Sequence, residues 1–288
     1  MARNRNRPAS LVHQVKEKLN SITRYGQSKH QDKLNHIAGN YIYSYDTRKA
    51  YLRHGCDFVL WCRDVYGCRM LEDCRQYAAA YIAMLQQKGQ SPSTLKLKAA
   101  AIAKLYSCTT AELGIVTPDR RRADITRSRG IKKSDKHFSE TRNEDLIAFC
   151  RGTGLRNHKE LQQLHGNQLV CDNDGQYWLM NIVGKGGKKR NVPVLPDYED
   201  VIAKYCRNAG DGLVWPHVSS HADIDSYRAD YAMAWYKRLA RDEIPKSEQY
   251  HCRRELVGVT YDKAAMQIVS RYLGHNRIGE IAGHYLHR

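Results

Sequence analysis

The sequence predicts a mainly α-helical protein that carries a small antiparallel β-sheet and is divided into two domains. Its 288 residues are enough for two hydrophobic cores, because a single core typically organises about 100 to 200 residues. Apolar residues recur with helical spacing between residues 41 and 116, and again from residue 198 onwards. Between residues 169 and 194 the apolar spacing changes to every second residue, which is typical of strands.

Residues 1–40 form a basic segment that we interpret as an N-terminal arm. Lysines and arginines dominate this segment, and only Glu17 and Asp32 oppose them. We expect a mobile arm with one short helix around Leu11 to Ile22. For any single basic residue here, a solvated tail that contacts nothing is the alternative.

Residues 41–116 are expected to form one small all-helical domain. A capping box, Thr109-x-x-Glu112, is expected to open a short fourth helix in it. The three helices before it are each predicted by one apolar stripe. The stripes are Tyr51, Phe58 and Cys62; Tyr77, Tyr81 and Met84; and Leu95, Ala99, Ile102 and Leu105.

Residues 117–138 read as a basic linker. Pro118 opens a stretch that is rich in arginine and lysine and has little apolar content before Phe138. Such a linker can lie along a phosphate backbone, and a merely solvated charge run is the alternative.

Residues 139–288 are expected to form a second domain in which helices surround a small sheet. We predict a helix from Glu144 to Arg151, then a turn and a helix over Gly154 to Leu164, and a mostly helical segment from Tyr198. The predicted strands alternate apolar and polar residues and are separated by turns at 172–175 and 184–187. Their alternating residues are Leu169 and Cys171; Tyr177, Leu179, Asn181 and Val183; and Val192 and Val194.

The charge balance points to a polyanionic partner. The formal net charge is +17, from 47 lysines and arginines against 30 acidic residues, and nucleic acid is the first candidate for such a field. An anionic membrane surface is the second candidate. No apolar run approaches the roughly 18 residues of a spanning helix, and the N-terminus lacks an apolar signal core. We therefore expect a soluble, cytoplasmic protein.

The cysteines and histidines do not predict a metal site. The chain has 9 cysteines and no CxxC pair, so neither a zinc knuckle nor a disulfide framework is indicated. His217 and His221 have the i, i+4 spacing of zinc ligands, but no third ligand lies near them in the sequence.

Five short boxes in the second domain carry the candidate chemistry. They are Thr153–Arg156 with Glu160, residues 184–193, His251–Arg254, Leu273–His275, and Tyr285. Each box alone has a structural explanation, such as a helix start, a solvated basic hairpin or a core histidine. A phosphate-binding P-loop is the rival for residues 184–193, but GxxxxGK[ST] is absent and no helix is predicted to follow. Together, in this order, the boxes resemble the tyrosine recombinase (phage-type integrase) family.

Two spacings depart from the family pattern. One extra residue separates Arg156 from Glu160, and Tyr285 lies one position further from His275 than is usual. The second departure predicts a bulge or shift in the helix that carries Tyr285. The chain also stops three residues after Tyr285, so exchange of a C-terminal tail between subunits is not expected.

The resemblance implies a helical core-binding domain and a catalytic domain that form a clamp around duplex DNA. It implies cleavage and rejoining of DNA strands through a 3′-phosphotyrosyl intermediate, for a mobile genetic element in a bacterial or phage context. No metal, ATP or other cofactor is implied. The implied catalytic residues are Arg156, Lys185, His251, Arg254, His275 and Tyr285.

These residue types suit displacement at a phosphodiester. Arginine forks match two phosphate oxygens and keep their charge at every working pH, so Arg156 and Arg254 would hold the transition state. Lys185, on a hairpin and surrounded by arginines, is expected to have a lowered pKa and to act as the general acid. Tyr285 would be the nucleophile, and His251 and His275 would donate hydrogen bonds to the phosphate or assist proton movement.

Double-stranded DNA is the expected partner, bound by a homotetramer on two DNA sites, with a directionality factor as a further candidate partner. The candidate DNA contacts lie on the third helix, the linker and the basic hairpin. They are Lys96, Lys98, Lys104, Arg120, Arg121, Arg122, Arg127, Arg129, Lys132, Lys133, Lys188, Lys189 and Arg190.

Two other functions are compatible with the sequence. A relative that has lost its chemistry would bind DNA in a salt-sensitive way without cleaving it. A type IB topoisomerase shares the catalytic residue types and would relax supercoiled plasmid as a monomer without site preference.

Overall fold

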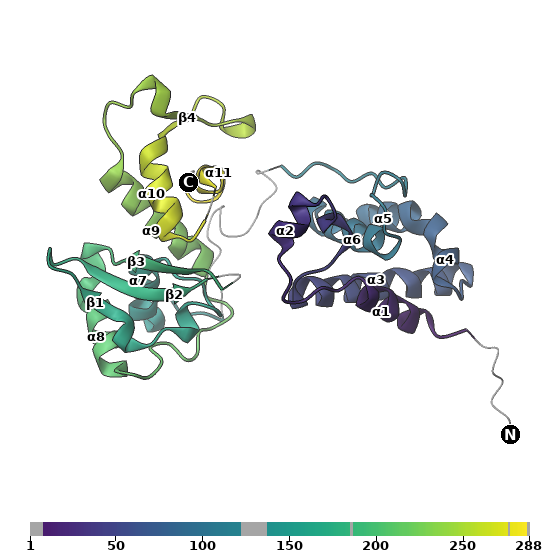
Figure 1. Cartoon of the computed structure of the whole chain (residues 1–288), viewed down its shortest axis with the longest axis horizontal. Coiled ribbons are helices and arrows are strands. Elements are labelled where there is room, and N and C mark those ends of the chain that lie inside the picture. The colour runs from purple at the N-terminus through teal and green to yellow at the C-terminus, as the bar shows by residue number, and fades with distance from the viewer. Residues whose placement is uncertain (1–7, 122–136, 185–186, 276, 287–288) are drawn as a thin grey trace. The chain divides into compact units, whose positions relative to one another are not determined.

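The computed structural model describes residues 8–121, 137–184, 187–275 and 277–286. The chain divides into two compact units, Met1–Arg121 and Arg122–Arg288. Helices predominate in the described part and the sheets are small and antiparallel, which confirms the predicted fold class (Figure 1). Within the described residues, no helix is long and apolar enough to span a bilayer.

The first unit is a set of helices packed around α3 (Tyr45–Tyr66). Ser44 begins α3 by accepting a hydrogen bond from the Thr47 N–H, and Gly67 ends it in the left-handed conformation at φ 71°. Both α1 and α6 pack against α3. The other elements are α1 (Leu11–Ser21), α2 (Lys29–Leu34), η1 (Ala38–Asn40), α4 (Leu71–Cys74), η2 (Arg75–Tyr77), α5 (Ala78–Gln87) and α6 (Pro92–Leu105).

Helix α1 belongs to the core of this unit, so the expectation of a mobile arm over residues 1–40 is wrong for the helix itself. Leu11, Val15 and Leu19 are buried in the same cluster as Phe58 and Ile102. Their i, i+4, i+8 spacing gives α1 an apolar stripe that α3 covers. The two lysines of α1, Lys16 and Lys18, lie outside this buried stripe. Residues 1–7 lie outside the described residues.

The capping box at Thr109 forms, but it does not open a helix. The Thr109 N–H donates to the Glu112 carboxylate over 2.7 Å, and the Glu112 N–H donates to Thr109 Oγ1 over 3.2 Å. The segment then closes as a turn, because Gly114 takes φ 64° and the Ile115 N–H returns to the Thr110 carbonyl. Reciprocal capping therefore stabilises a turn here.

The second unit contains the predicted three-stranded sheet in the order β1–β2–β3. Its strands are β1 (Leu169–Cys171), β2 (Tyr177–Val183) and β3 (Lys189–Pro193). A second, two-stranded sheet of β4 (Gln249–His251) and β5 (Thr260–Asp262) was not predicted. The sequence gives little signal for strands of three residues each.

The helices of the second unit pack around α9 (Ile224–Leu239), which contacts both α7 and α10. Helix α10 also contacts β3 and α11, so the sheet and the C-terminal helix meet at α10. The remaining elements are η4 (Thr141–Asn143), α7 (Glu144–Thr153), η5 (Leu161–Gln163), η6 (Gly166–Gln168), η7 (Pro196–Tyr198), α8 (Glu199–Ala209), η8 (Lys246–Glu248), η9 (Arg254–Leu256), α10 (Lys263–Tyr272) and α11 (Ile278–His284).

The helix expected from Gly154 to Leu164 is wrong. Gly154 ends α7 in the left-handed conformation at φ 58°, and a turn and η5 follow in place of a helix. The Glu160 carboxylate accepts the Arg156 N–H over 2.9 Å, which organises this loop through a side chain instead of a helical ladder.

Candidate active site

The Thr153–Arg156 box places Arg156 directly after α7. A Cβ atom on Gly154 would stand 2.4 Å from Cδ1 of the Tyr231 ring, so glycine is required there both for its φ and for the close approach of α9. Leu155 is buried and fixes the next residue in place. The box thus aims Arg156 out of the core, where its side chain is 29% exposed.

Glu160 is the buried anion that holds this arginine. Arg156 Nη1 donates to Glu160 Oε1 over 2.7 Å, and Arg190 donates to both carboxylate oxygens over 2.9 and 2.7 Å. Burial raises the pKa of the Glu160 carboxyl, but the hydrogen bonds and charge of Arg190 outweigh it and bring that pKa to about 2. Glu160 is therefore ionised, and the extra residue before it does not prevent contact with Arg156.

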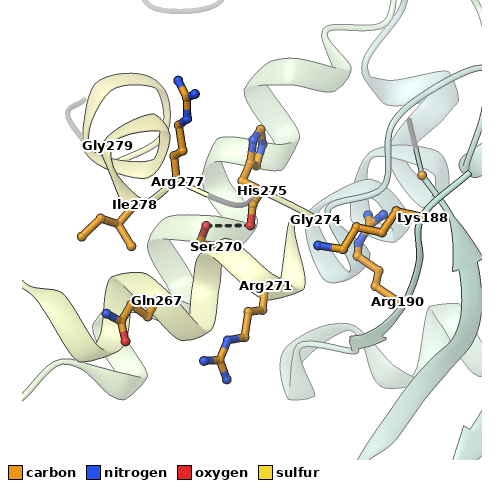
Figure 2. A pocket seen from close by; sticks show the side chains of 11 residues that line it. Lys188, Arg190, Gln267, Ser270, Arg271, Gly274, His275, Arg277, Ile278 and Gly279 are labelled. Atoms are coloured by element: carbon orange, nitrogen blue, oxygen red, sulfur yellow. Dashed lines mark hydrogen bonds between the residues drawn. The ribbon is translucent and has the colours of Figure 1, made fainter. Parts of the chain in front are cut away.

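His275 is presented by the Leu273–His275 box at the end of α10. Gly274 takes φ 72°, and the His275 N–H donates to the Ser270 carbonyl over 2.8 Å. The Ser270 hydroxyl donates in turn to the His275 carbonyl over 3.1 Å (Figure 2). His275 Nε2 lies 3.5 Å from Arg156 Nη2. The two boxes, more than a hundred residues apart, therefore meet at this contact.

The protonation state of His275 follows from its surroundings. Burial, and then the charges of Arg228 and Arg156, lower the pKa of the imidazole from 6.5 to about 4. The ring is therefore neutral near pH 7. Because a guanidinium has no acceptor atom, we assign the single proton of the neutral ring to Nδ1 and leave Nε2, which faces Arg156, unprotonated.

Tyr285 follows α11 and completes the cluster. Its hydroxyl lies 3.1 Å from His275 Nε2, so it donates to the lone pair of that nitrogen. The Tyr285 N–H still reaches the Ile281 carbonyl over 3.0 Å, and the backbone leaves the helix at Tyr285 with φ −127°. The helical hydrogen bonds of α11 thus extend as far as Tyr285.

Arg228 is a third cation of this cluster, beside Arg156 and Arg190, that sequence reasoning missed. It is only 1% exposed, and its guanidinium carbon lies 5.8 Å from the centroid of the Tyr285 ring. No motif marks it. The one available signal is a charged residue within the apolar stripe of α9, between Ile224 and Tyr231.

A basic cavity of about 980 Å³ opens beside His275. Its wall includes Gln267 and Arg271 of α10, Arg277 at the start of α11, and Lys188 of the hairpin (Figure 2). Within the described part of the chain, no ion pair involves Arg271 or Arg277. Arg271 and Arg277 therefore contribute positive charge to the wall of the cavity.

The other three catalytic candidates are not joined to this cluster by the described contacts. Lys185 lies outside the described residues, and so does the side chain of Arg254, whose backbone begins η9. His251 is exposed on β4, where its Nδ1 lies 3.1 Å from Thr260 Oγ1. Among the described residues, no contact links His251 to Arg156, His275 or Tyr285.

Three of the expected DNA contacts are placed differently from the prediction. Lys98 is only 8% exposed, because it shares the buried face of α6 with Leu95 and Ile102. Lys104 donates to the Gly39 carbonyl. The Arg190 guanidinium is 8% exposed and is occupied by Glu160 and by the Tyr272 carbonyl, so it organises the site and does not face solvent.

The remaining basic candidates lie at the surface or outside the described residues. Lys96 is half exposed and stands 3.8 Å from Asp119, while Arg120, Arg121, Lys188 and Lys189 are exposed. Those outside the described residues are Arg122, Arg127, Arg129, Lys132 and Lys133.

No protein-family model and no curated protein matches the chain. Among solved structures, it is similar to the Tn1549 transposon integrase in complex with circular intermediate DNA, with 12% identity and a TM-score of 0.51 over 97% of this chain and 96% of that one. A variant of that integrase in complex with transposon right end DNA matches with 12% identity and a TM-score of 0.49 over the same shares. The XerA recombinase matches with 14% identity and a TM-score of 0.32 over 95% of this chain and 94% of that one. The first of these likenesses shows the fold.

Proposed function

We propose that this chain, which has the tyrosine recombinase fold, cleaves and rejoins DNA strands with Tyr285 as the nucleophile. One observation carries the proposal. The Tyr285 hydroxyl lies 3.1 Å from His275 Nε2, and the same nitrogen lies 3.5 Å from the guanidinium of Arg156. A phenol, a neutral base and a fixed cation that come from three separate boxes thus stand at one point.

The first step needs the phenolic proton to leave as the oxygen attacks phosphorus. Neutral His275 is placed to accept that proton at Nε2, because the Tyr285 hydroxyl already donates there. A new bond forms between the Tyr285 oxygen and phosphorus, and the bond from phosphorus to the 5′ oxygen breaks. The departing 5′ oxygen takes a proton from a general acid, a role that the family resemblance gives to Lys185.

Arg156 supplies charge for the transition state. Negative charge grows on the non-bridging phosphate oxygens, and a preorganised guanidinium stabilises it without reorganisation. Glu160 fixes Arg156 in place through two hydrogen bonds while Arg190 neutralises the same carboxylate. The resemblance gives Arg254 the second position on the phosphate.

The covalent phosphotyrosyl ester retains the energy of the broken bond, so a 5′ hydroxyl can reverse the attack and rejoin a strand. Both the Tn1549 integrase structures contain DNA. We propose double-stranded DNA as the substrate of this chain, bound as a tetramer on two sites of a mobile element. The cavity with Arg271 and Arg277 would receive backbone phosphates next to the reacting one.

A nicked suicide duplex tests the proposal. The duplex carries the sequence that the protein selects from a randomised pool, and the nick lets the cleaved fragment diffuse away, so a covalent adduct accumulates. We expect an adduct with the wild type and none with Tyr285→Phe. The control is Tyr45→Phe, which removes the same hydroxyl from a 69% exposed ring in the first unit. Normal trapping by Tyr285→Phe would refute the assignment, and tight binding without an adduct from any variant would favour a DNA-binding protein without chemistry.

A further inference from the structure

Arg228 is a buried cation whose presence in the core needs an explanation. It projects from α9 and is 1% exposed, at a stripe position where an apolar residue would pack without loss of hydration. Burial lowers the pKa of its guanidinium, while the neighbouring Tyr285 and Glu160 oppose that shift. Something other than packing therefore accounts for an arginine at this position.

The need to neutralise Glu160 does not explain why an arginine is buried at position 228. Arg228 Nη1 stands 3.8 Å from Glu160 Oε2, whereas Arg156 and Arg190 already make direct hydrogen bonds of 2.7 to 2.9 Å to both carboxylate oxygens. The carboxylate is satisfied without Arg228. Arg228 donates its hydrogen bonds to backbone carbonyls and not to Glu160.

The guanidinium contacts each of the three segments that build the cluster. It donates to the carbonyl of Gly154, two residues before Arg156. It donates over 3.3 Å to the carbonyl of Leu273, two residues before His275. Its carbon also lies 5.8 Å from the centroid of the Tyr285 ring. A planar fork with several donors can make all these contacts at once, which a lysine cannot.

We propose that Arg228 is a positioning residue of the cleavage step, which joins the segments of Arg156 and His275 to each other and sets the Tyr285 ring against them. This role rests on the proposed function of Tyr285. Its charge also lies on the nucleophile's side of the site, where negative charge develops on the phenolic oxygen as the proton moves to His275. Arg228 contacts neither the phosphate nor the leaving group in this account.

Two substitutions separate positioning from folding. Arg228→Met fills a similar volume without charge, and Glu160 keeps its two closer partners in that variant. Arg228→Lys keeps the charge but cannot bond both carbonyls. The matched control is Arg238→Met on the same helix, where the arginine is 41% exposed and pairs with Asp197 over 2.7 Å. Each protein is measured for thermal unfolding, for affinity to the intact duplex and for single-turnover cleavage of the nicked duplex at saturating protein.

We expect Arg228→Met to bind the intact duplex within about threefold of the wild type. It should cleave the nicked duplex roughly 100-fold more slowly, which is the effect of misplacing reacting groups by about 1 Å. Arg228→Lys should cleave at an intermediate rate, and Arg238→Met should behave as the wild type.

A second substrate identifies the side of the reaction that is affected. A 5′-bridging phosphorothiolate has a leaving group that needs no proton, so it should rescue Lys185→Ala and leave Arg228→Met slow. Cleavage by Arg228→Met at the wild-type rate would overturn the proposal. So would a parallel loss of folding, DNA binding and cleavage in both Arg228 variants, because that result assigns Arg228 to the fold alone. Absence of an adduct from the wild type would overturn the proposed function as well, and this distinguishes the two failures.

Discussion

His275 is the residue whose electrostatics bear most directly on the chemistry. Its pKa is lowered to about 4 by burial and by the charges of Arg228 and Arg156, so it remains a proton acceptor far below neutral pH. We predict that the single-turnover cleavage rate shows no acidic limb between about pH 5 and 7, where an ordinary histidine would titrate. The measurement is the rate as a function of pH, with DNA affinity determined at each point.

The control for this profile is His251→Gln, which removes the other candidate histidine. An acidic limb near pH 6.5 that persists in His251→Gln would give His275 an ordinary pKa and contradict the account.

Glu160 makes the free energy of unfolding of the second unit depend on pH. Its pKa is about 2 in the folded chain against an ordinary 4.5, so ionised Glu160 contributes stability that is fully present above about pH 4.5 and is lost as pH falls toward 2. The shift corresponds to about 3 kcal/mol. Glu160→Gln should therefore lower the free energy of unfolding at pH 7 and flatten its dependence on pH below about 5.

Denaturant unfolding at several pH values checks this prediction. Asp262, whose pKa is lowered chiefly by its hydrogen bonds with Arg241, titrates in the same direction and remains in the variant, so part of the acid dependence should persist. An unchanged pH dependence in Glu160→Gln would contradict the role given to Glu160.

At the residue scale, motifs identified Arg156, His275 and Tyr285, which the structure brings together, but they could not identify Arg228. Its contacts are to backbone carbonyls of Gly154 and Leu273, which leave no trace in a sequence pattern. Arg190 was misread because Lys188 and Lys189 surround it with charge. Side chains alternate between the two faces along β3, and this alternation shows that Arg190 lies on the buried face. Arg190 pairs with the buried Ile182 and shares a face with Val192.

The end of α7 is the element on which the site depends most directly. Gly154 is left-handed and its hydrogen faces the Tyr231 ring of α9, where a Cβ would stand 2.4 Å from Cδ1. We predict that Gly154→Ala lowers the free energy of unfolding by about 2 to 5 kcal/mol, from backbone strain and overpacking together. Denaturant unfolding of the purified variant measures the loss.

Gly175→Ala is the matched control, because Gly175 is also left-handed, at φ 83°, but no atom lies within 4 Å of an added Cβ. It should cost only about 1 to 2 kcal/mol. Equal losses in the two variants would show that the approach of α9 imposes no constraint at Gly154.

Elements with a regular period were predictable and irregular ones were not. The alternation over 177–183 and 192–194 located the main sheet, and apolar stripes located α3, α5 and α6. The segment after Gly154 has helical composition, yet the Glu160 carboxylate and the contacts of Arg156 with distant His275 decide its conformation. Such long-range contacts override local propensity.

The positive charge of the whole molecule should determine how the proposed DNA binding depends on salt. With a net charge of +17, we predict that affinity for duplex DNA falls by about 10³ to 10⁵ between 50 and 200 mM salt, as for about 6 to 10 phosphate contacts. Arg271→Ala and Arg277→Ala should each reduce the slope of log affinity against log salt by about 1, because each would remove one of the phosphate contacts that we propose for the cavity. Titrations at several salt concentrations measure these slopes.

The control is Arg238→Ala, an arginine on α9 that does not line the cavity and should leave the slope unchanged. Equal slopes in the wild type and the three variants would show that the cavity does not contact DNA phosphates.

At the scale of the whole chain, composition indicated nucleic acid and two domains but misplaced the start of the helical unit. The charges of residues 1–40 favoured the interpretation as a mobile arm. The apolar stripe of Leu11, Val15 and Leu19 nevertheless packs on α3. A stripe is a stronger guide to packing than net charge, because burial of three apolar side chains contributes several kcal/mol, about 1.5 to 3 each.

The phenol of Tyr285 should become joined to DNA, and digestion of the trapped adduct with nuclease and protease tests this directly. Mass spectrometry of the peptides should place the residual nucleotide on Tyr285 and on no other of the 19 tyrosines. A nucleotide on a different side chain would contradict the account.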